Sequence, residues 1–251
     1  TGKPQSINYL ANLLKEIEKI TESENLTLFE ALTCAFLKYC EQYNDNISII
    51  EAGLFHQFDA TNVFKKNLCT LLSAINIDHL KWIKNKTIEG IIHEKTVKLL
   101  NSNIFVNMQE NKEISKMIKN SLLNNKSNKF FYGEDFNYLR AENNFILYED
   151  SKGSIVLPPP NVLGEHQLSN ISTSIMTART LFNVKDENIK KAVKNIFLKG
   201  RLQEIKTGKL KKLARSNKLF CDGGHNKSAA NSLTKWIETL NQDVHLILGM
   251  M

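Results

Sequence analysis

Short apolar runs alternate with helical patterns along the first half of the chain, and this alternation constrains the fold more than any other feature. Helices are expected at 87–100 and 111–123, and buried strands at 47–51, 70–77 and 104–106. This order is typical of βαβ units, in which successive strands lie parallel. The sequence therefore predicts an α/β fold with a mostly parallel sheet flanked by helices. A capping box at 27–30 predicts one more helix ahead of the first strand.

The pattern changes after Asn124. Short runs at 130–132, 144–148 and 154–157 are separated by turn-forming residues and predict a small antiparallel sheet. Two helical patterns follow it, at 164–182 and 186–198.

A helix stop at Lys199-Gly200 predicts a domain boundary. Beyond it, strands are expected at 202–207, 218–222 and 244–248, with a helix at 226–240. So little secondary structure supplies too small a core for a complete α/β domain. We therefore expect 200–251 to be the start of a truncated Rossmann-like unit.

The composition excludes several classes of function. The 251 residues carry a net charge of +7, but the lysines are scattered, so neither nucleic acid nor a membrane surface is an expected partner. No apolar run is long enough to span a bilayer, and the first residues lack the apolar core of a signal peptide. The four cysteines match no zinc pattern and are expected as free thiols in a reducing cytoplasm.

The most informative motif for function is D-G-G-H-N at 222–226, which follows an apolar run and precedes a helical pattern. Open α/β sheets bind their ligands where strands end, and glycines let the backbone approach a ligand closely. Asp222 and His225 would bring a carboxylate and an imidazole to that edge. A plain strand–turn–helix with Asx-turn chemistry is the alternative.

Together with G-R-L-Q at 200–203, this motif resembles the folylpolyglutamate synthase/dihydrofolate synthase family of the Mur ligase group. That family has P-G-R-L-Q and then D-G-A-H-N-P, whereas Lys199 and Lys227 replace the two prolines here. The resemblance implies that Arg201 and Asp222 contact a nucleotide. It also implies that His225 lies near the reacting phosphate or the glutamate substrate.

Residues 51–62 resemble the family's E-x-G-L-G-G-R-x-D-A-T-N, in which the glutamate binds magnesium. Glu51 matches that ligand, and D-A-T-N is present at 59–62. The central Gly-Gly-Arg is replaced by F-H-Q at 55–57, so bulky residues stand where glycines permit a tight backbone. The exchange also removes an anion-binding guanidinium.

Two further segments resemble metal-binding motifs of the family. S-A-I-N-I-D-H at 73–79 resembles T-S-I-G-L-D-H, which makes His79 the second implied magnesium ligand; on its own, His79 fits a structural role as well. Lys95 matches a lysine that is carbamylated in many members. An exposed helical lysine paired with a nearby acid is the alternative for Lys95.

G-E-H-Q-L-S-N at 164–170 resembles the family's G-x-H-Q-x-x-N at the start of a helix. The resemblance implies that Gln167 and Asn170 lie near the nucleotide, since helix N-termini offer free backbone donors. Ordinary helix capping is the alternative.

The sequence contains no match to the family's phosphate-binding loop, G-T-N-G-K-G-S. T-G-K-P-Q-S at 1–6 is only superficially similar, because no strand precedes it and Pro4 lacks an N–H group where donors are needed. We therefore expect a copy truncated at both ends: an ATP-binding Mur-ligase-like central domain at 1–199, and the start of a glutamate-ligase domain at 200–251.

The resemblance implies an ATP- and magnesium-dependent cytoplasmic ligase that adds L-glutamate to dihydropteroate or a folyl glutamate through an acyl phosphate. A monomer is expected, to which a separate fragment could supply the phosphate-binding loop. Two alternatives stay open. One is a non-catalytic remnant that binds a nucleotide or a partner. The other is a Mur-type peptidoglycan ligase, which the motifs at 59–62 and 222–226 disfavour.

Overall fold

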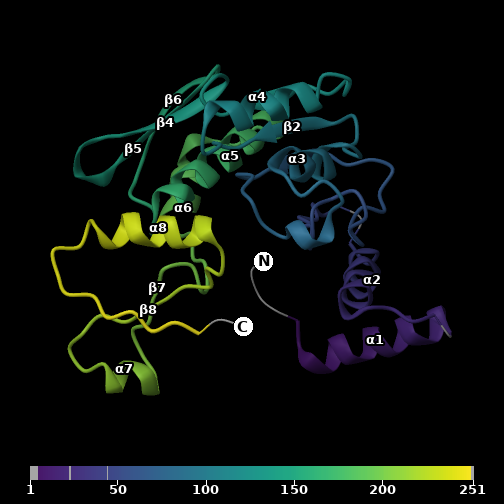
Figure 1. Ribbon diagram of the computed structural model, residues 1–251, viewed down its shortest axis with the longest axis horizontal. Coiled ribbons are helices and arrows are strands. Elements are labelled where there is room, and N and C mark those ends of the chain that lie inside the picture. Colours follow the sequence, from purple (N-terminus) through teal and green to yellow (C-terminus); the bar gives the residue numbers. More distant parts are fainter. Residues whose placement is uncertain (1–4, 23, 44, 250–251) are drawn as a thin grey trace.

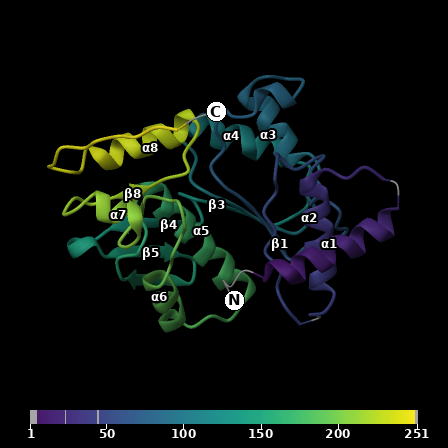
Figure 2. The same ribbon diagram turned by 90° about the horizontal axis from the view of Figure 1, so that it is seen from below.

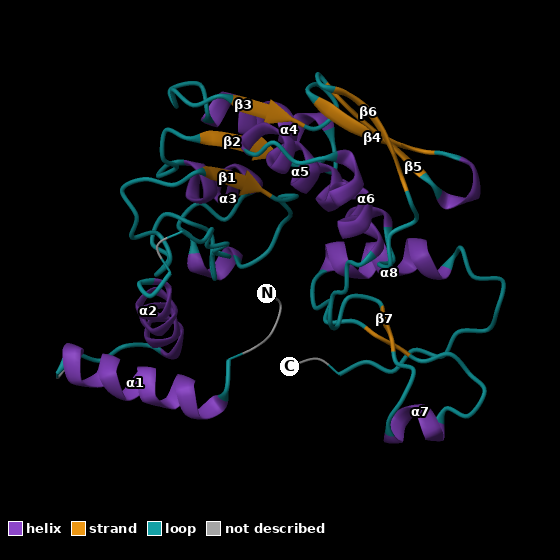
Figure 3. Ribbon diagram, turned by 180° about the vertical axis from the view of Figure 1, so that it is seen from behind, coloured by secondary structure: helices purple, strands orange, loops and turns teal. Residues whose placement is uncertain are grey.

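The structure of the protein is a computed structural model that describes residues 5–22, 24–43 and 45–249. A parallel sheet is formed by β1 (Cys69–Leu72), β2 (Asn103–Val106) and β3 (Lys129–Phe131), in that order across the sheet (Figure 3). Helices α3 (Ile88–Thr96) and α4 (Lys112–Ser121) connect these strands. The predicted parallel sheet is thus confirmed, although β1 is shorter than the run expected at 70–77.

Alternation along β2 explains how the sheet is buried on both faces. Ile104 and Val106 pack in one cluster with residues of α3 and α4, whereas Phe105 belongs to the cluster formed with α5 (Glu165–Leu181). All three side chains are at most 1% exposed. Parallel sheets are usually covered in this way, because the crossover helices lie on their faces.

A separate antiparallel sheet contains β4 (Phe136–Arg140), β5 (Ile146–Asp150) and β6 (Gly153–Leu157). Tyr138, Tyr148 and Ile155 lie on its buried face and pack with residues of α5 and α6 (Asp186–Lys194).

The prediction that 130–132 belongs to the antiparallel sheet is wrong. Instead, β3 pairs in parallel with β2, with Phe130 opposite Phe105. An apolar run of three residues has the same pattern in both kinds of sheet, so only the long-range pairing decides. β4 was not predicted, although Phe136 and Tyr138 point inward and alternate with Asn137 and Leu139.

Two helices near the N-terminus pack on each other. α2 (Leu28–Cys40) begins with the predicted capping box, in which Glu30 N donates to Thr27 Oγ1 and the Glu30 side chain accepts from Thr27 N. α1 (Ile7–Thr21) was not predicted and begins at the N-cap residue Ser6. The two helices share a small core and lie side by side, apart from the sheets (Figures 1 and 2). Most of the phosphate-loop-like stretch, residues 1–4, lies outside the described residues.

The predicted buried strand at 47–51 is wrong: this segment is irregular, and Ile49 is 91% exposed. A strand needs a hydrogen-bonded neighbour. β1 is the edge strand of the described sheet, and no described strand pairs with its outer edge.

The segment after Lys199 forms a small unit. β7 (Gln203–Glu204) pairs antiparallel with β8 (Phe220–Cys221), and α7 (Lys209–Leu213) lies between them in sequence. α8 (Lys227–Ile237) follows β8 and packs through Trp236 on Phe220. The strand expected at 244–248 is wrong, because that segment is irregular and exposed in the described structure. Among residues 5–22, 24–43 and 45–249, no helix combines the length and apolar character needed to cross a bilayer.

Candidate functional site

The two motifs of the C-terminal unit form one hydrogen-bonded structure. The Asp222 carboxylate accepts a hydrogen bond from Leu202 N at 2.7 Å and another from Gly224 N at 2.7 Å. Gly223 N donates to Gly200 O at 2.8 Å. Asp222 therefore holds the loop at 222–226 against the turn at 200–203. Its bond to Gly224 N is the Asx turn that the sequence offered as an alternative, so the Asx turn is part of this arrangement.

The turn at 200–203 contains an unusual backbone conformation. Leu202 has a φ of +44° and is only 5% exposed. A non-glycine residue in this region is strained, and it persists only where the surroundings hold it. The buried Leu202 side chain and the hydrogen bond from Leu202 N to Asp222 keep the residue in this conformation. The consequence is a fixed position for Arg201 next to the loop.

This turn and loop meet the beginning of α5 at His166. Burial lowers the pKa of His166, while the nearby charges of Asp222 and Arg201 act on it in opposite directions. Gly164 seats the imidazole, because a Cβ there would lie 2.6 Å from His166 Cε1, and its φ is +95°. His166 Nδ1 is buried without a hydrogen-bond partner among the described residues. His166 was quoted only as part of a motif, so the sequence did not predict its position between the two units.

Gln167 and Asn170 belong to a polar network beneath the same helix start. Asn170 Nδ2 donates to Gln167 Oε1 at 3.3 Å, and Asn170 Oδ1 accepts from Asn107 Nδ2 at 2.7 Å. Asn107 directly follows β2, is 3% exposed and also accepts from Thr173 Oγ1 at 2.9 Å. Helix capping does not explain Gln167 and Asn170, because α5 begins after Gly164 without a side-chain cap. Asn107 was missed, although its place after a strand was a usable signal.

A second group of predicted residues gathers around Asp78. Asp78 Oδ2 accepts from Asn226 Nδ2 at 2.8 Å, and Asp78 Oδ1 accepts from His79 N at 2.7 Å. Partial burial would raise the pKa of Asp78, but these hydrogen bonds and the charges of His79 and His225 hold it below its usual value. His225 itself is exposed, with Nδ1 3.2 Å from Gly223 O.

His79 lies beside Phe55. Its φ is +54°, and its ring meets the Phe55 ring edge-on with the centroids 6.3 Å apart. Phe55 has a φ of +56°. The aromatic residue therefore keeps a left-handed conformation that suits the glycine of the resembled motif.

Lys95 lies near the end of α3 and is half-buried. Burial lowers its pKa, and Asp78 offsets part of this effect. Lys95 Nζ lies 5.9 Å from the centroid of the Phe55 ring. No carboxylate of the described residues lies within 4 Å of Lys95, so the alternative of an ion-paired surface lysine does not hold.

Glu51 belongs neither to the group around His166 and Arg201 nor to the group around Asp78. It is exposed on irregular backbone and makes no hydrogen bond or ion pair within the described residues. Nor does the described part of the chain contain three or more His, Cys, Asp or Glu side chains grouped to hold a metal ion. Glu51 and His79 could act only as the one or two protein ligands that magnesium takes beside water and phosphates. The magnesium site stays a prediction.

An aromatic cavity of about 260 Å³ adjoins the Asp78 group. Phe55 lines this cavity and also lies beside His79 and Lys95. Gly53 lets the backbone approach the Phe29 ring closely, because a Cβ at position 53 would lie 2.5 Å from that ring. No motif of the sequence predicted this cavity. Its large apolar lining residues come from three segments: Phe29, Leu54, Phe55, Phe58, Trp82 and Ile83.

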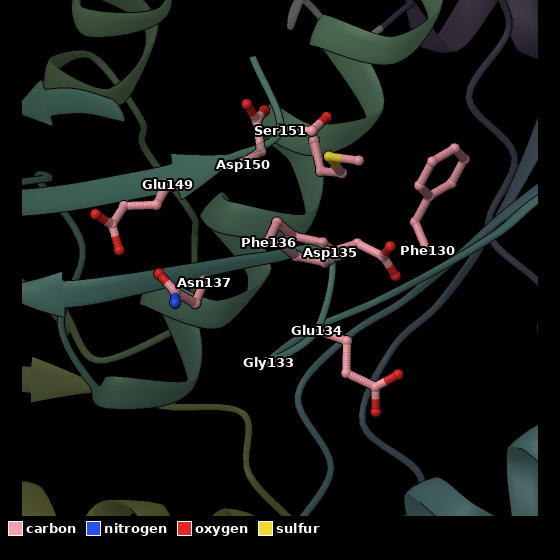
Figure 4. Close-up of a pocket in the computed structure, with 10 residues that line it drawn as sticks. Phe130, Gly133, Glu134, Asp135, Phe136, Asn137, Glu149, Asp150 and Ser151 are labelled. Atoms are coloured by element: carbon pink, nitrogen blue, oxygen red, sulfur yellow. The ribbon is translucent and has the colours of Figure 1, made fainter. Parts of the chain in front are cut away.

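A larger cavity of about 350 Å³ lies between the β3–β4 turn and the β5–β6 hairpin (Figure 4). Its carboxylates are already engaged. Glu134 pairs with Lys119, Asp150 pairs with Arg179 at 3.0 Å, and Asp135 accepts from Phe131 N at 2.6 Å. None of the predicted site residues lines it, so this cavity is not the candidate site.

Comparisons with known proteins agree with the predicted resemblance. No protein-family model matches the chain. A probable dihydrofolate synthetase of Schizosaccharomyces pombe is 24% identical over 86% of this chain and 51% of its own length. A dihydrofolate synthase/folylpolyglutamate synthase of Haemophilus influenzae is 27% identical over 89% of this chain and 51% of its own length.

Among solved structures, E. coli FolC in complex with DHPP and ADP superposes with a TM-score of 0.81 at 23% identity. The match covers 97% of this chain and 55% of that one. The α/β fold with a parallel and an antiparallel sheet is thereby confirmed. The chain spans about half the length of the curated relatives it matches.

Proposed function

From the relationship to dihydrofolate and folylpolyglutamate synthases, we propose that this chain is part of an ATP-dependent ligase of folate metabolism. One observation carries the proposal: the loop at 222–226 contacts both groups of predicted residues. Asp222 bonds to the turn that contains Arg201 and lies close to His166 at the start of α5, and Asn226 bonds to Asp78 beside His79. A single loop thus connects the region proposed to bind the nucleotide, at the start of α5, with the region around Asp78 and His79, where the reaction is proposed to occur. The boundary at Lys199 and the start of a glutamate-ligase domain beyond it belong to the same proposal.

The nucleotide is proposed to bind between α5 and the turn at 200–203. The first N–H groups of α5 are free of a side-chain cap and favour an anion. Arg201 adds a guanidinium, which suits phosphate oxygens. Gln167 and Asn170 provide amide groups, and Asp222 fixes the turn. The related E. coli enzyme was solved with ADP, which supports a nucleotide as the ligand.

The second substrate is proposed to place its ring in the aromatic cavity. Flat rings pack favourably against aromatic side chains, and Phe29, Phe55 and Trp82 provide them. A pterin attached to a carboxylate, in dihydropteroate or a folyl glutamate, has this shape. The lining gives no corresponding reason to favour a peptidoglycan precursor, and the named relatives point to folates.

The proposed reaction has two steps. A carboxylate oxygen of the pterin substrate attacks the terminal phosphorus of ATP, and ADP leaves. The amine of L-glutamate then attacks the acyl carbon, the new amide bond forms, and inorganic phosphate leaves. His225 is proposed to lie near the transferring phosphate or the incoming amine. Lys95 has a lowered pKa, so more of it is the neutral amine that carbamylation requires.

Magnesium would neutralise the phosphates of ATP, with Glu51 and His79 as its candidate ligands. Because the structure does not group them into a site, none of these assignments depends on the ion. The sequence also lacks a match to a phosphate-binding loop. We therefore propose only that these residues contribute to nucleotide binding; a non-catalytic remnant that binds nucleotide is the competing proposal.

Isothermal titration calorimetry with ADP tests nucleotide binding. We expect the folded chain to bind ADP, and Arg201→Ala to bind at least about tenfold more weakly, as the loss of a charge-assisted hydrogen bond predicts. Arg215→Ala, an exposed arginine of the same unit, is the matched control and should bind like the unaltered chain. No binding by a folded chain, or equal weakening in both variants, would contradict the proposal.

A further inference from the structure

Asp78 holds a central place in the candidate site, although no motif had assigned it a role. Its hydrogen bond with Asn226 joins the C-terminal unit to the rest of the molecule. Within the described residues, it is the only direct hydrogen bond between 201–249 and 5–199. We infer that Asp78 is a positioning residue, which latches the 222–226 loop so that His225 faces His79 and Lys95. The inference rests on the proposed function.

The partner side chain uses both ends of its amide. Asn226 Oδ1 accepts from Ala229 N at 2.9 Å and so caps α8, while Asn226 Nδ2 donates to Asp78. The first turn of α8 is thereby attached to the segment that follows β1. Any movement of Asp78 is transmitted to the start of this helix and to the loop before it.

The electrostatic surroundings explain why an acid stands at this position. His79, His225 and Lys95 all act on the Asp78 carboxylate or are acted on by it. Asp78 thus lies near three basic side chains that come from different segments, and its Oδ2 is 3.7 Å from His79 Nε2. The same carboxylate accepts from His79 N, which fixes its direction toward the loop.

A swap of the two side chains tests the latch without disturbing the cap. In Asn226→Asp, the new carboxylate still accepts from Ala229 N but faces Asp78 with a like charge. Adding Asp78→Asn restores a donor, because an amide at position 78 can accept from His79 N and donate to the new carboxylate. In the double variant the hydrogen bond therefore forms again with donor and acceptor exchanged, position 78 donating and position 226 accepting.

Hydrogen–deuterium exchange of the full chain measures the latch in the absence of any ligand. We expect Asn226→Asp to raise amide exchange about tenfold at 78–83 and at 223–230, because it breaks a hydrogen bond to a charged group. The double variant should return both segments to the rates of the unaltered chain. The control Asn226→Asp with Asp243→Asn has the same composition as the double variant but keeps the acid at position 78, and it should exchange as fast as Asn226→Asp alone.

Unchanged exchange in Asn226→Asp would overturn the inference. Exchange in the double variant that stays as fast as in Asn226→Asp would overturn it as well. The titration with ADP is independent of this result: its failure removes the nucleotide site and leaves the exchange data to decide the latch.

Discussion

At the scale of single residues, the candidate site stores backbone strain. Phe55, His79 and Leu202 all have positive φ values, and each lies in or next to the groups described above. Such residues cost free energy and persist where the surrounding structure holds them, which is common at binding sites. The sequence showed one of these places, because F-H-Q at 55–57 replaces glycines of the resembled motif.

The ion pair between Asp150 and Arg179 is buried, whereas that between Glu165 and Arg140 is exposed. The side chains of Asp150 and Arg179 are 1% and 11% exposed, against 49% and 52% for the other pair. We expect Arg179→Met to lower the free energy of unfolding by about 3 kcal/mol, because it leaves a buried carboxylate without its counter-charge. Arg140→Met should cost less than about 1 kcal/mol. Equal losses in urea unfolding would contradict this account.

The buried amine of Lys95 predicts a pH-dependent effect on stability. A base whose pKa is lowered by folding binds its proton more tightly when unfolded, so its burial cost is fully present at low pH and disappears above the unfolded pKa. We therefore expect Lys95→Met to raise the free energy of unfolding at pH 7. The gain should shrink as the pH rises toward 10.5, the ordinary value for lysine.

Urea unfolding at a series of pH values measures this gain. The exposed Lys98 provides the control, because Lys98→Met should show no gain that depends on pH. A gain from Lys95→Met that is constant or grows with pH would contradict the burial of a charged amine.

At the scale of elements, helix propensity and packing predict opposite effects on stability when Gly90 of α3 is replaced by alanine. Alanine would stabilise an exposed helix by about 1 kcal/mol relative to glycine. At Gly90, however, a Cβ would lie 1.9 Å from the backbone oxygen of Asn85. We expect Gly90→Ala to destabilise the protein by at least about 1 kcal/mol, because overpacking forces the backbone to move. Thermal unfolding measures it, with the exposed Lys116→Ala of α4 as the control; a stabilised Gly90→Ala would refute the contact.

The elements that the sequence predicted well are those with strong local signals. The capping box at Thr27 begins α2, and the patterns at 111–123 and 164–182 became α4 and α5. The errors concern pairing. The 47–51 and 244–248 segments have strand-like composition but no strand beside them in the described structure, and 130–132 joined a different sheet. The composition of a segment indicates its tendency to form a strand. Which strand it pairs with, if any, depends on contacts with distant parts of the chain.

The same distinction applies to the candidate site. The motifs predicted Gln167, Asn170, Arg201, Asp222, His79, Lys95 and His225, and the structure arranges them in two groups joined by one loop. Glu51 stays outside both groups. The residues that sequence reasoning missed act over long separations: Asp78 reaches Asn226, Asn107 reaches Asn170, and His166 lies near Arg201. The place of Asn107 after a strand was a usable signal for that residue, but no local pattern marks which residue it contacts.

At the scale of the whole molecule, the C-terminal unit contacts the rest of the molecule through the 222–226 loop. Helices α1 and α2 lie on the other side of the molecule from α7 and α8 (Figure 1). The basic net charge of +7 would attract anionic ligands such as nucleotides and folates. Because the chain spans about half of each curated relative, the complete reaction is proposed rather than derived. For this half we propose nucleotide binding where α5 meets the turn at 200–203.

Photoaffinity labelling with 8-azido-ADP, followed by peptide mapping, locates the bound nucleotide. We predict that the label attaches within 164–170 or 200–226, and that excess ADP suppresses it. Attachment to the residues that line the larger cavity, such as Asn137 or Glu149, or no labelling that ADP suppresses, would contradict it.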